Sequence, residues 1–173
     1  MITKNELRDS LIHELKVIRT LMTKLPEGAG DYRPSPDQRS TLELAHYLCK
    51  VGQGCVRAGL EGSFEWFGSE GGRYDSLRFA EIPAVLDQEI TEISRLFAEM
   101  TDEDFADKTV DMQAAGMGTW KLQGWLLNTA LKFTAAYKLQ LFLYAKAAGN
   151  GALDTFDAWM DTGGVPRPTP ANS

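Results

Sequence analysis

The chain has 173 residues, of which 43% are hydrophobic and 24% are charged, and its formal net charge is -6 at neutral pH. This length fits one soluble domain with its own core, and a negative charge without clustered Lys or Arg argues against a nucleic-acid partner. No apolar run is long enough to cross a bilayer, and the first residues lack the pattern of a signal peptide. We therefore expect a cytoplasmic protein that binds neither nucleic acid nor membrane.

The first predicted helix starts at a capping box. Thr3 and Glu6 stand three residues apart, the spacing at which the two side chains satisfy free backbone amides at a helix start. Apolar residues then recur at steps of four and three until Pro26; they are Leu7, Leu11, Leu15, Ile18, Met22 and Leu25. This pattern predicts a helix with one buried face, as in a helical bundle.

The second predicted helix follows a connection that contains two prolines and opens at another capping box, Ser40 with Glu43. His46 borders its buried stripe, and Cys49 and Cys55 are expected to be reduced thiols because they lack a C-x-x-C spacing. The remaining stripe positions are Leu42, Ala45, Gly52, Val56 and Leu60, and the glycines Gly52, Gly54 and Gly59 predict close approach of a neighbouring element.

Residues 61–79 mix aromatic residues with glycines and show no sustained period, which predicts a long loop. Its rings Phe64, Trp66 and Phe67 either cover the mouth of a pocket or plug the end of the bundle. Pro83 opens a third helix with the apolar positions Leu86, Ile90, Ile93, Phe97 and Met100. Its acidic residues are expected to form a solvated face; they are Glu81, Asp87, Glu89, Glu92 and Glu99.

The fourth helix is predicted over residues 119–149, after a stretch of extended chain near residues 108–113. Gly149 is expected to end it in a left-handed conformation. Its inward face is expected to comprise Leu122, Leu126, Thr129, Phe133, Tyr137, Gln140 and Tyr144. A short segment over residues 152–160 then packs on the bundle. The predicted organisation is one all-α domain over residues 1–162, an antiparallel four-helix bundle with a short extra C-terminal segment, followed by a flexible tail over residues 163–173.

Several local patterns carry a family resemblance. They are YRPSP at residues 32–36, RSTLELAHYL at 39–48, YKLQLFLYAKAAG at 137–149 and LDTFDAWMD at 153–161. In their order and separation the sequence resembles the DinB-like superfamily, which includes YfiT-type metal-dependent hydrolases and the bacillithiol and mycothiol S-transferases. The resemblance implies a divalent metal, such as nickel or zinc, held by one His of the second helix and two His four apart on the fourth.

Carried over to this chain, the resemblance places the metal ligands at His46, Phe133 and Tyr137. Phenylalanine cannot bind a metal, and tyrosine does so well only as a phenolate. Because the chain has two histidines in total, we expect the three-histidine site to be degenerate and no metal cofactor to be bound. A divalent metal such as nickel or zinc is the alternative.

Three arrangements remain open around these positions. The former site is filled by packing, with His46 donating to Tyr137 or to a carbonyl; or it forms a metal-free pocket; or His46 recruits Cys49 or Glu43 into an atypical metal site. The candidate pocket comprises His46, Cys49, Trp125, Thr129, Phe133, Tyr137 and Gln140, with His46 and Tyr137 as candidate catalytic residues. We expect a homodimeric protein that binds a small molecule or a partner. The alternative is a metal-dependent thiol S-transferase or hydrolase around His46.

Overall fold

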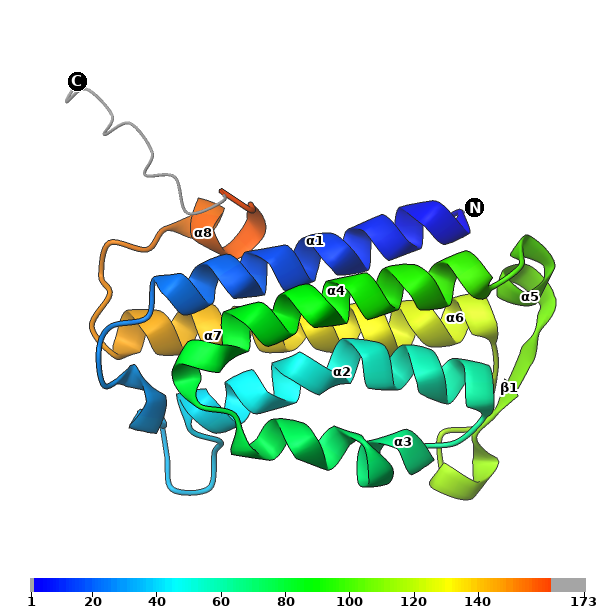
Figure 1. Cartoon of the computed structure of the whole chain (residues 1–173), viewed down its shortest axis with the longest axis horizontal. Helices are drawn as coiled ribbons and strands as arrows, with labels where there is room; N and C mark the ends of the chain where they lie inside the picture. Colours follow the sequence, from blue (N-terminus) through cyan, green and yellow to red (C-terminus); the bar gives the residue numbers. More distant parts are fainter. Residues whose placement is uncertain (1, 163–173) are drawn as a thin grey trace.

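Four long helical segments pack side by side along the molecule (Figure 1). The computed structural model describes residues 2–162, so the prediction of a flexible tail over residues 163–173 lies outside them. The segments are α1 (Lys4–Thr23), α2 (Thr41–Glu61), α4 (Ile82–Glu99), and a final segment made of α6 (Leu122–Leu126) and α7 (Lys132–Ala147) with a π-helical turn (Leu127–Leu131) between them. Both α1 and α2 pack against α4 and against α7. The predicted all-α four-helix bundle is confirmed.

The direction of the helices explains why the second connection is long. In Figure 1, α1 and α7 run one way, whereas α2 and α4 run the other, so the chain must travel back along the bundle between α2 and α4. It does so through α3 (Glu65–Ser69) and the 3₁₀ helices η2 (Gly71–Ser76) and η3 (Phe79–Glu81). Both α3 and η2 pack on α2. The loop predicted over residues 61–79 is therefore largely short helices, which form an extra wall beside α2 and α4.

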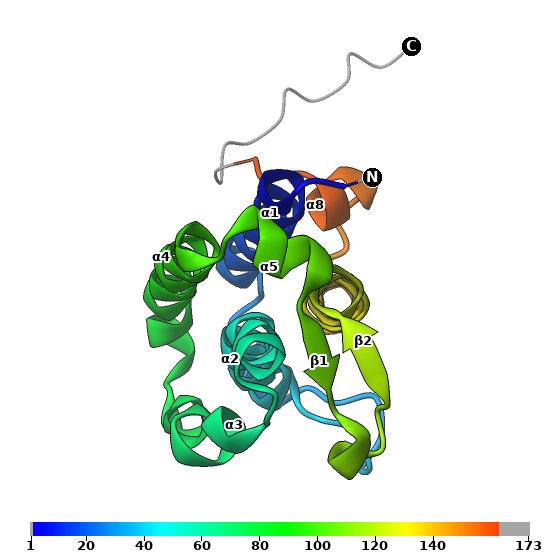
Figure 2. The ribbon, with the colours of Figure 1, turned by 90° about the vertical axis from the view of Figure 1, so that its right-hand side faces the viewer.

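The fourth helix starts later than its sequence suggests. After the short helix α5 (Asp102–Asp107), β1 (Thr109–Asp111) pairs antiparallel with β2 (Thr119–Lys121), and Val110 stands opposite Trp120. Figure 2 shows this hairpin at the end of the bundle that faces the viewer. The predicted helix start at residue 119 is wrong because residues 119–121 have a strand partner, and such pairing overrides a helical periodicity. The extended chain expected near residues 108–113 is confirmed at β1.

A π-helical turn changes which residues of the last segment face the core. Such a turn inserts one extra residue into the helical repeat, so the buried stripe moves by one position after Leu127–Leu131. Leu122 and Leu126 before the turn and Thr129 within it are buried, as predicted. After the turn the buried residues are Thr134, Lys138, Leu141, Phe142, Tyr144 and Ala145, so the prediction also holds at Tyr144. Phe133, Tyr137 and Gln140, which were predicted to face inward, are only half-buried, and Phe133 and Tyr137 pack against the core from its margin.

The displaced stripe brings a lysine into the core. The Lys138 ammonium lies 2.6 Å from the Glu14 carboxylate on α1, in an ion pair whose angles fall outside hydrogen-bond geometry. It also lies 4.7 Å from the centroid of the Trp159 ring on α8 (Thr155–Trp159). The short helix α8 packs on α1 and α7, as expected for the segment after the fourth helix, although the Trp159 side chain is 53% exposed.

The glycines of α2 permit close packing, as predicted. A Cβ atom at Gly59 would lie 2.5 Å from the ring of Trp125, and one at Gly54 would lie 2.2 Å from the ring of Phe67. Both distances are too short for a side chain. The two cysteines of this helix are buried and free, which confirms the expectation of reduced thiols.

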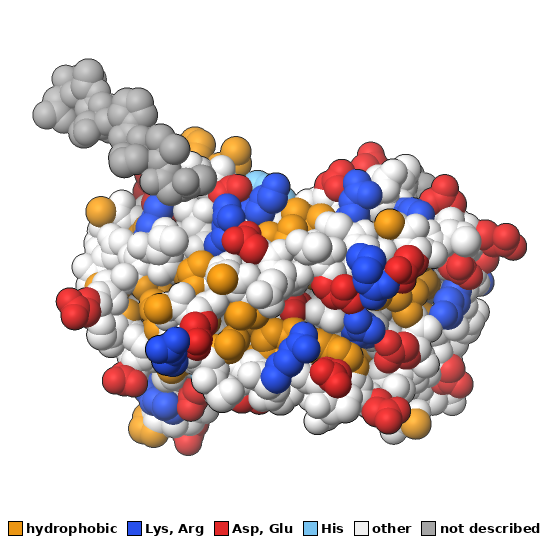
Figure 3. All heavy atoms as spheres, viewed as in Figure 1, with side chains coloured by type: hydrophobic (Ala, Val, Ile, Leu, Met, Phe, Trp, Pro, Cys, Tyr) orange, Lys and Arg blue, Asp and Glu red, His pale blue; other side chains and the backbone are white. Residues whose placement is uncertain are grey.

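The surface in Figure 3 carries acidic and basic side chains in alternation, with hydrophobic side chains visible between them. This face therefore has no field of a single sign. Over residues 2–162, no helix has the combination of length and apolar character that crossing a membrane requires.

Candidate functional site

His46, the first site residue expected from the sequence, is 8% exposed on α2. Its ring nitrogen Nε2 lies 2.8 Å from the carbonyl oxygen of Leu77. A carbonyl oxygen only accepts, so Nε2 carries the hydrogen and donates it. His46 thereby ties α2 to the chain that leads into α4, which corresponds to the packing arrangement with a carbonyl partner.

Cys49, Trp125 and Thr129 lie in closed packing. The indole nitrogen of Trp125 donates to the Cys55 carbonyl at 2.8 Å, and the Thr129 hydroxyl donates to the Trp125 carbonyl at 2.7 Å. Burial, with a smaller contribution from the nearby Glu89 carboxylate, raises the pKa of the Cys49 thiol well above its usual range. The thiol therefore stays protonated, a form that neither attacks substrates nor binds metals well.

Phe133, Tyr137 and Gln140 lie at the margin of the bundle. The Tyr137 ring packs edge-on against Tyr47, with centroids 4.8 Å apart, and the Arg39 guanidinium lies 5.7 Å from the Tyr137 centroid. The Gln140 amide donates to the Tyr144 hydroxyl at 2.6 Å. None of these contacts involves His46, which bonds to Leu77 instead.

The positions that the resemblance assigns to a metal do not fit a three-ligand site. His46 uses Nε2 in its bond to Leu77, Phe133 has no donor atom, and Tyr137 packs among Tyr47 and Arg39. One imidazole alone holds a cation poorly. Within the described range, no three or more His, Cys, Asp and Glu side chains are grouped so that they could hold a metal ion.

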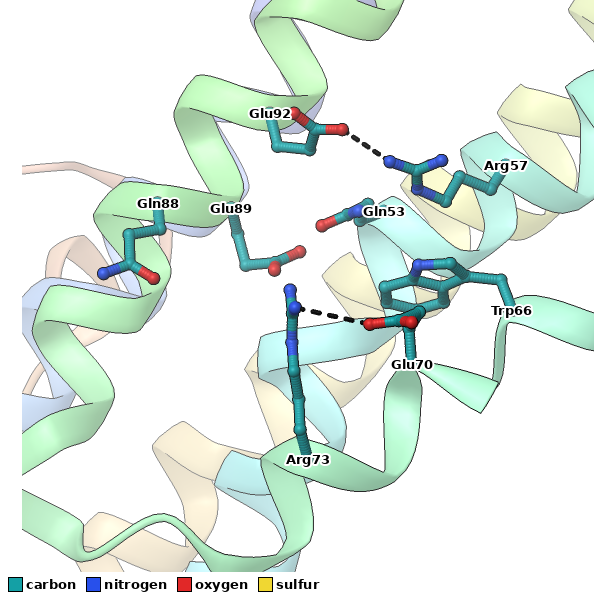
Figure 4. Close-up of a pocket in the computed structure, with 8 residues that line it drawn as sticks. All are labelled: Gln53, Arg57, Trp66, Glu70, Arg73, Gln88, Glu89 and Glu92. Atoms are coloured by element: carbon teal, nitrogen blue, oxygen red, sulfur yellow. Dashed lines mark hydrogen bonds and ion pairs between the residues drawn. The ribbon is translucent and has the colours of Figure 1, made fainter. Parts of the chain in front are cut away.

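A polar pocket of about 450 Å³ opens elsewhere, between α2, the α3–η2 wall and α4 (Figure 4). We call it the Glu89 pocket. Gln53 and Arg57 come from α2; Trp66, Glu70 and Arg73 come from α3 and the chain that follows; Gln88, Glu89 and Glu92 come from α4. The long return connection therefore completes a site that α2 and α4 could not enclose by themselves.

Glu89 lies at the floor of this pocket and is 3% exposed. Its Oε1 atom accepts a very short hydrogen bond from the Tyr74 hydroxyl. The Gln53 amide is assigned the orientation that gives all its neighbours a hydrogen-bond partner. In this orientation its nitrogen donates to both Glu89 oxygens at 2.9 Å, and its oxygen accepts from Arg57 Nε at 2.8 Å. The Glu89 carboxylate thus receives hydrogen bonds from two uncharged groups.

The charged groups at the rim pair with one another. Arg57 contacts Glu92 at 2.6 Å, and Arg73 lies 3.6 Å from Glu70, the two pairs drawn in Figure 4. Arg73 also donates to the Tyr74 hydroxyl at 2.8 Å. Among the residues that the structure describes, none forms an ion pair with Glu89.

This environment changes the acidity of the pocket floor. Burial raises the pKa of Glu89 to about 7, although the Tyr74 hydrogen bond and the nearby Arg73 charge act in the opposite direction. Burial also raises the pKa of the Tyr74 hydroxyl, and the hydrogen bond to Glu89 adds to this increase. Glu89 therefore changes its charge near neutral pH, whereas Tyr74 remains a hydrogen-bond donor.

The expectation that Glu89 belongs to a solvated face is wrong. Glu89 stands three residues after Leu86 and four before Ile93, and all three are buried. These steps place them on one stripe of α4. A carboxylate at a core position of a helix was therefore a usable signal, but the apolar residue next to it, Ile90, fits the same period almost as well.

The architecture is that of a DinB-like protein. Among solved structures, a DinB-like protein of Bacillus subtilis, YjoA, is similar to this chain with a TM-score of 0.68, over 83% of this chain and 92% of that one. The two sequences are 15% identical, so the similarity concerns the fold. No protein-family model matches the sequence, and a comparison with curated proteins found no match.

Proposed function

We propose that this DinB-like chain is a small-molecule-binding protein and that its ligand occupies the Glu89 pocket. The pocket volume of about 450 Å³ is within the range of small-molecule sites. Three separate elements converge on it, and it combines the Trp66 ring with hydrogen-bonding groups. In this proposal the three-histidine metal site of the resemblance has been lost.

The observation that carries the proposal is the burial of Glu89 without a cationic partner among the described residues. A carboxylate that is 3% exposed and surrounded by the neutral donors Tyr74 and Gln53 costs free energy to ionise. A leucine at this position would continue the stripe of Leu86 and Ile93. A buried ionisable group at the floor of a cavity is characteristic of binding and catalytic sites.

The test is a thermal-shift and NMR screen of polar small molecules against three proteins: wild type, Glu89→Gln and Glu99→Gln. Glu99 is an exposed carboxylate at the end of the same helix, paired with Arg95, and serves as the matched control. We expect ligands that bind wild type and Glu99→Gln but bind Glu89→Gln at least tenfold more weakly. A screen without ligands, or ligands unaffected by Glu89→Gln, would overturn the proposal.

Two further variants separate the proposed site from the one expected from the sequence. Ligands that are lost in His46→Gln or Tyr137→Phe, but kept in Glu89→Gln, would place binding near those residues. Stoichiometric nickel or zinc in the purified protein, lost in His46→Ala, would instead support the metal-dependent thiol S-transferase or hydrolase.

The assembly and location of the chain are separate proposals. We expect a homodimer, which light scattering of the purified protein tests directly. We also expect a cytoplasmic location and no nucleic-acid partner, which fractionation and a binding assay with duplex DNA would test.

A further inference from the structure

We propose that the Glu89 pocket selects a ligand with a primary ammonium group on a flat apolar body. This inference rests on the proposed function, because it names the class of ligand for the same site. It starts from the charges of the lining residues. Glu92 pairs with Arg57 and Glu70 pairs with Arg73, which leaves Glu89 as the one lining charge without an opposite partner among the described residues. A ligand cation would complete the pairing.

The hydrogen bonds of Glu89 favour the same class. Oε1 accepts from both Tyr74 and Gln53, whereas Oε2 accepts from Gln53 alone. A carboxylate oxygen can accept two hydrogen bonds, so Oε2 retains the capacity for another donor. Figure 4 shows the Glu89 carboxylate directed into the space between Gln53 and Arg73. An ammonium group supplies hydrogen donors together with a positive charge.

Trp66 provides the surface for the body of the ligand. Its side chain lines the pocket opposite α4 and is 7% exposed. The Arg57 guanidinium already lies 5.9 Å from the ring centroid, so this indole tolerates a cation nearby. A flat apolar group can stack on such a ring while its ammonium group reaches Glu89.

The charge of Arg73 opposes the binding of a cationic ligand near Glu89. Its side chain is 61% exposed, and its guanidinium donates to Tyr74, which in turn donates to Glu89. The positive charge of Arg73 therefore opposes a second cation at the pocket floor. At a pH well above the pKa of Glu89, where this group is ionised in both proteins, removal of the Arg73 charge should strengthen the binding of an ammonium ligand, whereas it should weaken the binding of an anion.

Protons also compete with the ligand. Charged or titratable groups near Glu89 are Arg73 and Tyr74 on η2, Arg57 and Cys49 on α2, and Glu92 on α4. With a pKa of about 7, the ionised fraction of Glu89 rises about tenfold between pH 6 and pH 8. The affinity for an ammonium ligand should rise by about the same factor over this interval.

The experiment is a calorimetric and NMR titration at constant ionic strength with three probes that share a phenyl ring and differ in charge: benzylammonium, benzyl alcohol and benzoate. We expect benzylammonium to bind wild type at least tenfold more tightly than either other probe. Binding should weaken at least tenfold in Glu89→Gln, tighten in Arg73→Gln and stay unchanged in Glu99→Gln. The rise in affinity with pH in wild type provides a readout that requires no variant.

Other results would overturn the inference in distinguishable ways. Benzoate that binds more tightly than benzylammonium, and is lost in Arg73→Gln, would make the ligand an anion while keeping the pocket. If none of the probes binds but the wider screen yields ligands that depend on Glu89, the ammonium class is wrong and the proposed function stands. If that screen also finds none, both proposals fail.

Discussion

Replacement of Glu89 by glutamine should change how the stability of the protein depends on pH. The glutamine side chain has nearly the same volume and can still accept a hydrogen bond from Tyr74, but it cannot ionise. In wild type the pKa of Glu89 is raised from an ordinary 4.5 to about 7 by burial. The folded state therefore keeps a proton that the unfolded state has already lost between these values. This contribution to stability is fully present below pH 4.5 and disappears as the pH rises through about 7.

The size of the effect follows from the two pKa values. A tenfold change in an acidity constant corresponds to about 1.4 kcal/mol, so the full contribution is about 3 kcal/mol. Because Glu89 is 3% exposed, solvent screening reduces it little. Integrated from about pH 5 to about pH 8, the stability of Glu89→Gln relative to wild type should increase by about 2.5 kcal/mol.

The assay is urea denaturation of both proteins at a series of pH values, followed by circular dichroism. The difference between the two unfolding free energies cancels the titration of all other groups that the substitution leaves unchanged. Glu99→Gln is the matched control, because Glu99 is an exposed carboxylate on the same helix that pairs with Arg95 and does not line the pocket. The stability of Glu99→Gln relative to wild type should change much less over the same pH interval. Parallel curves for wild type and Glu89→Gln would refute the assignment of a buried, partly neutral carboxyl.

Two further predictions concern the core. Lys138→Met should lower the free energy of unfolding by about 3 kcal/mol, because it leaves the Glu14 carboxylate without its buried partner. In urea denaturation, the double variant with Glu14→Leu should recover most of this loss. A double variant as unstable as the single one would contradict the explanation. Gly59→Ala should lower the melting temperature and cost about 1–3 kcal/mol, because the added carbon would lie 2.5 Å from the fully buried Trp125. In the control Gly68→Ala, the added carbon meets no side chain or backbone from another part of the chain within 4 Å, so this variant should not lose stability.

The bundle itself was predictable because its signals are local. Thr3 with Glu6 and Ser40 with Glu43 form the capping boxes expected at the starts of α1 and α2. Most of their periodic apolar residues are buried as expected, and Pro83 lies in the first turn of α4. Each of these features depends on residues only three or four positions apart, so the chain specifies them without help from the rest of the molecule.

The candidate site was less predictable because the buried stripes of two helices, α7 and α4, differ by one position from those expected. The π-helical turn displaced the inward face from Phe133 and Tyr137 to Thr134 and Lys138. On α4, the choice between Glu89 and Ile90 for one buried position was decided by packing. Positions three and four residues further along a helix lie on nearly the same face, so the apolar period alone does not choose between them.

The sequence by itself determined the four long helices, the capped starts of the first two, the reduced cysteines and the shortage of histidines for a three-histidine site. Only the tertiary structure decided that Glu89 is buried and that the connection after α2 folds into a wall opposite α4. The physical reason is the range of the interactions involved. Capping boxes and apolar stripes depend on residues within one or two helical turns. The ionisation of Glu89 depends on Gln53, Tyr74 and Arg73, which the fold alone brings together.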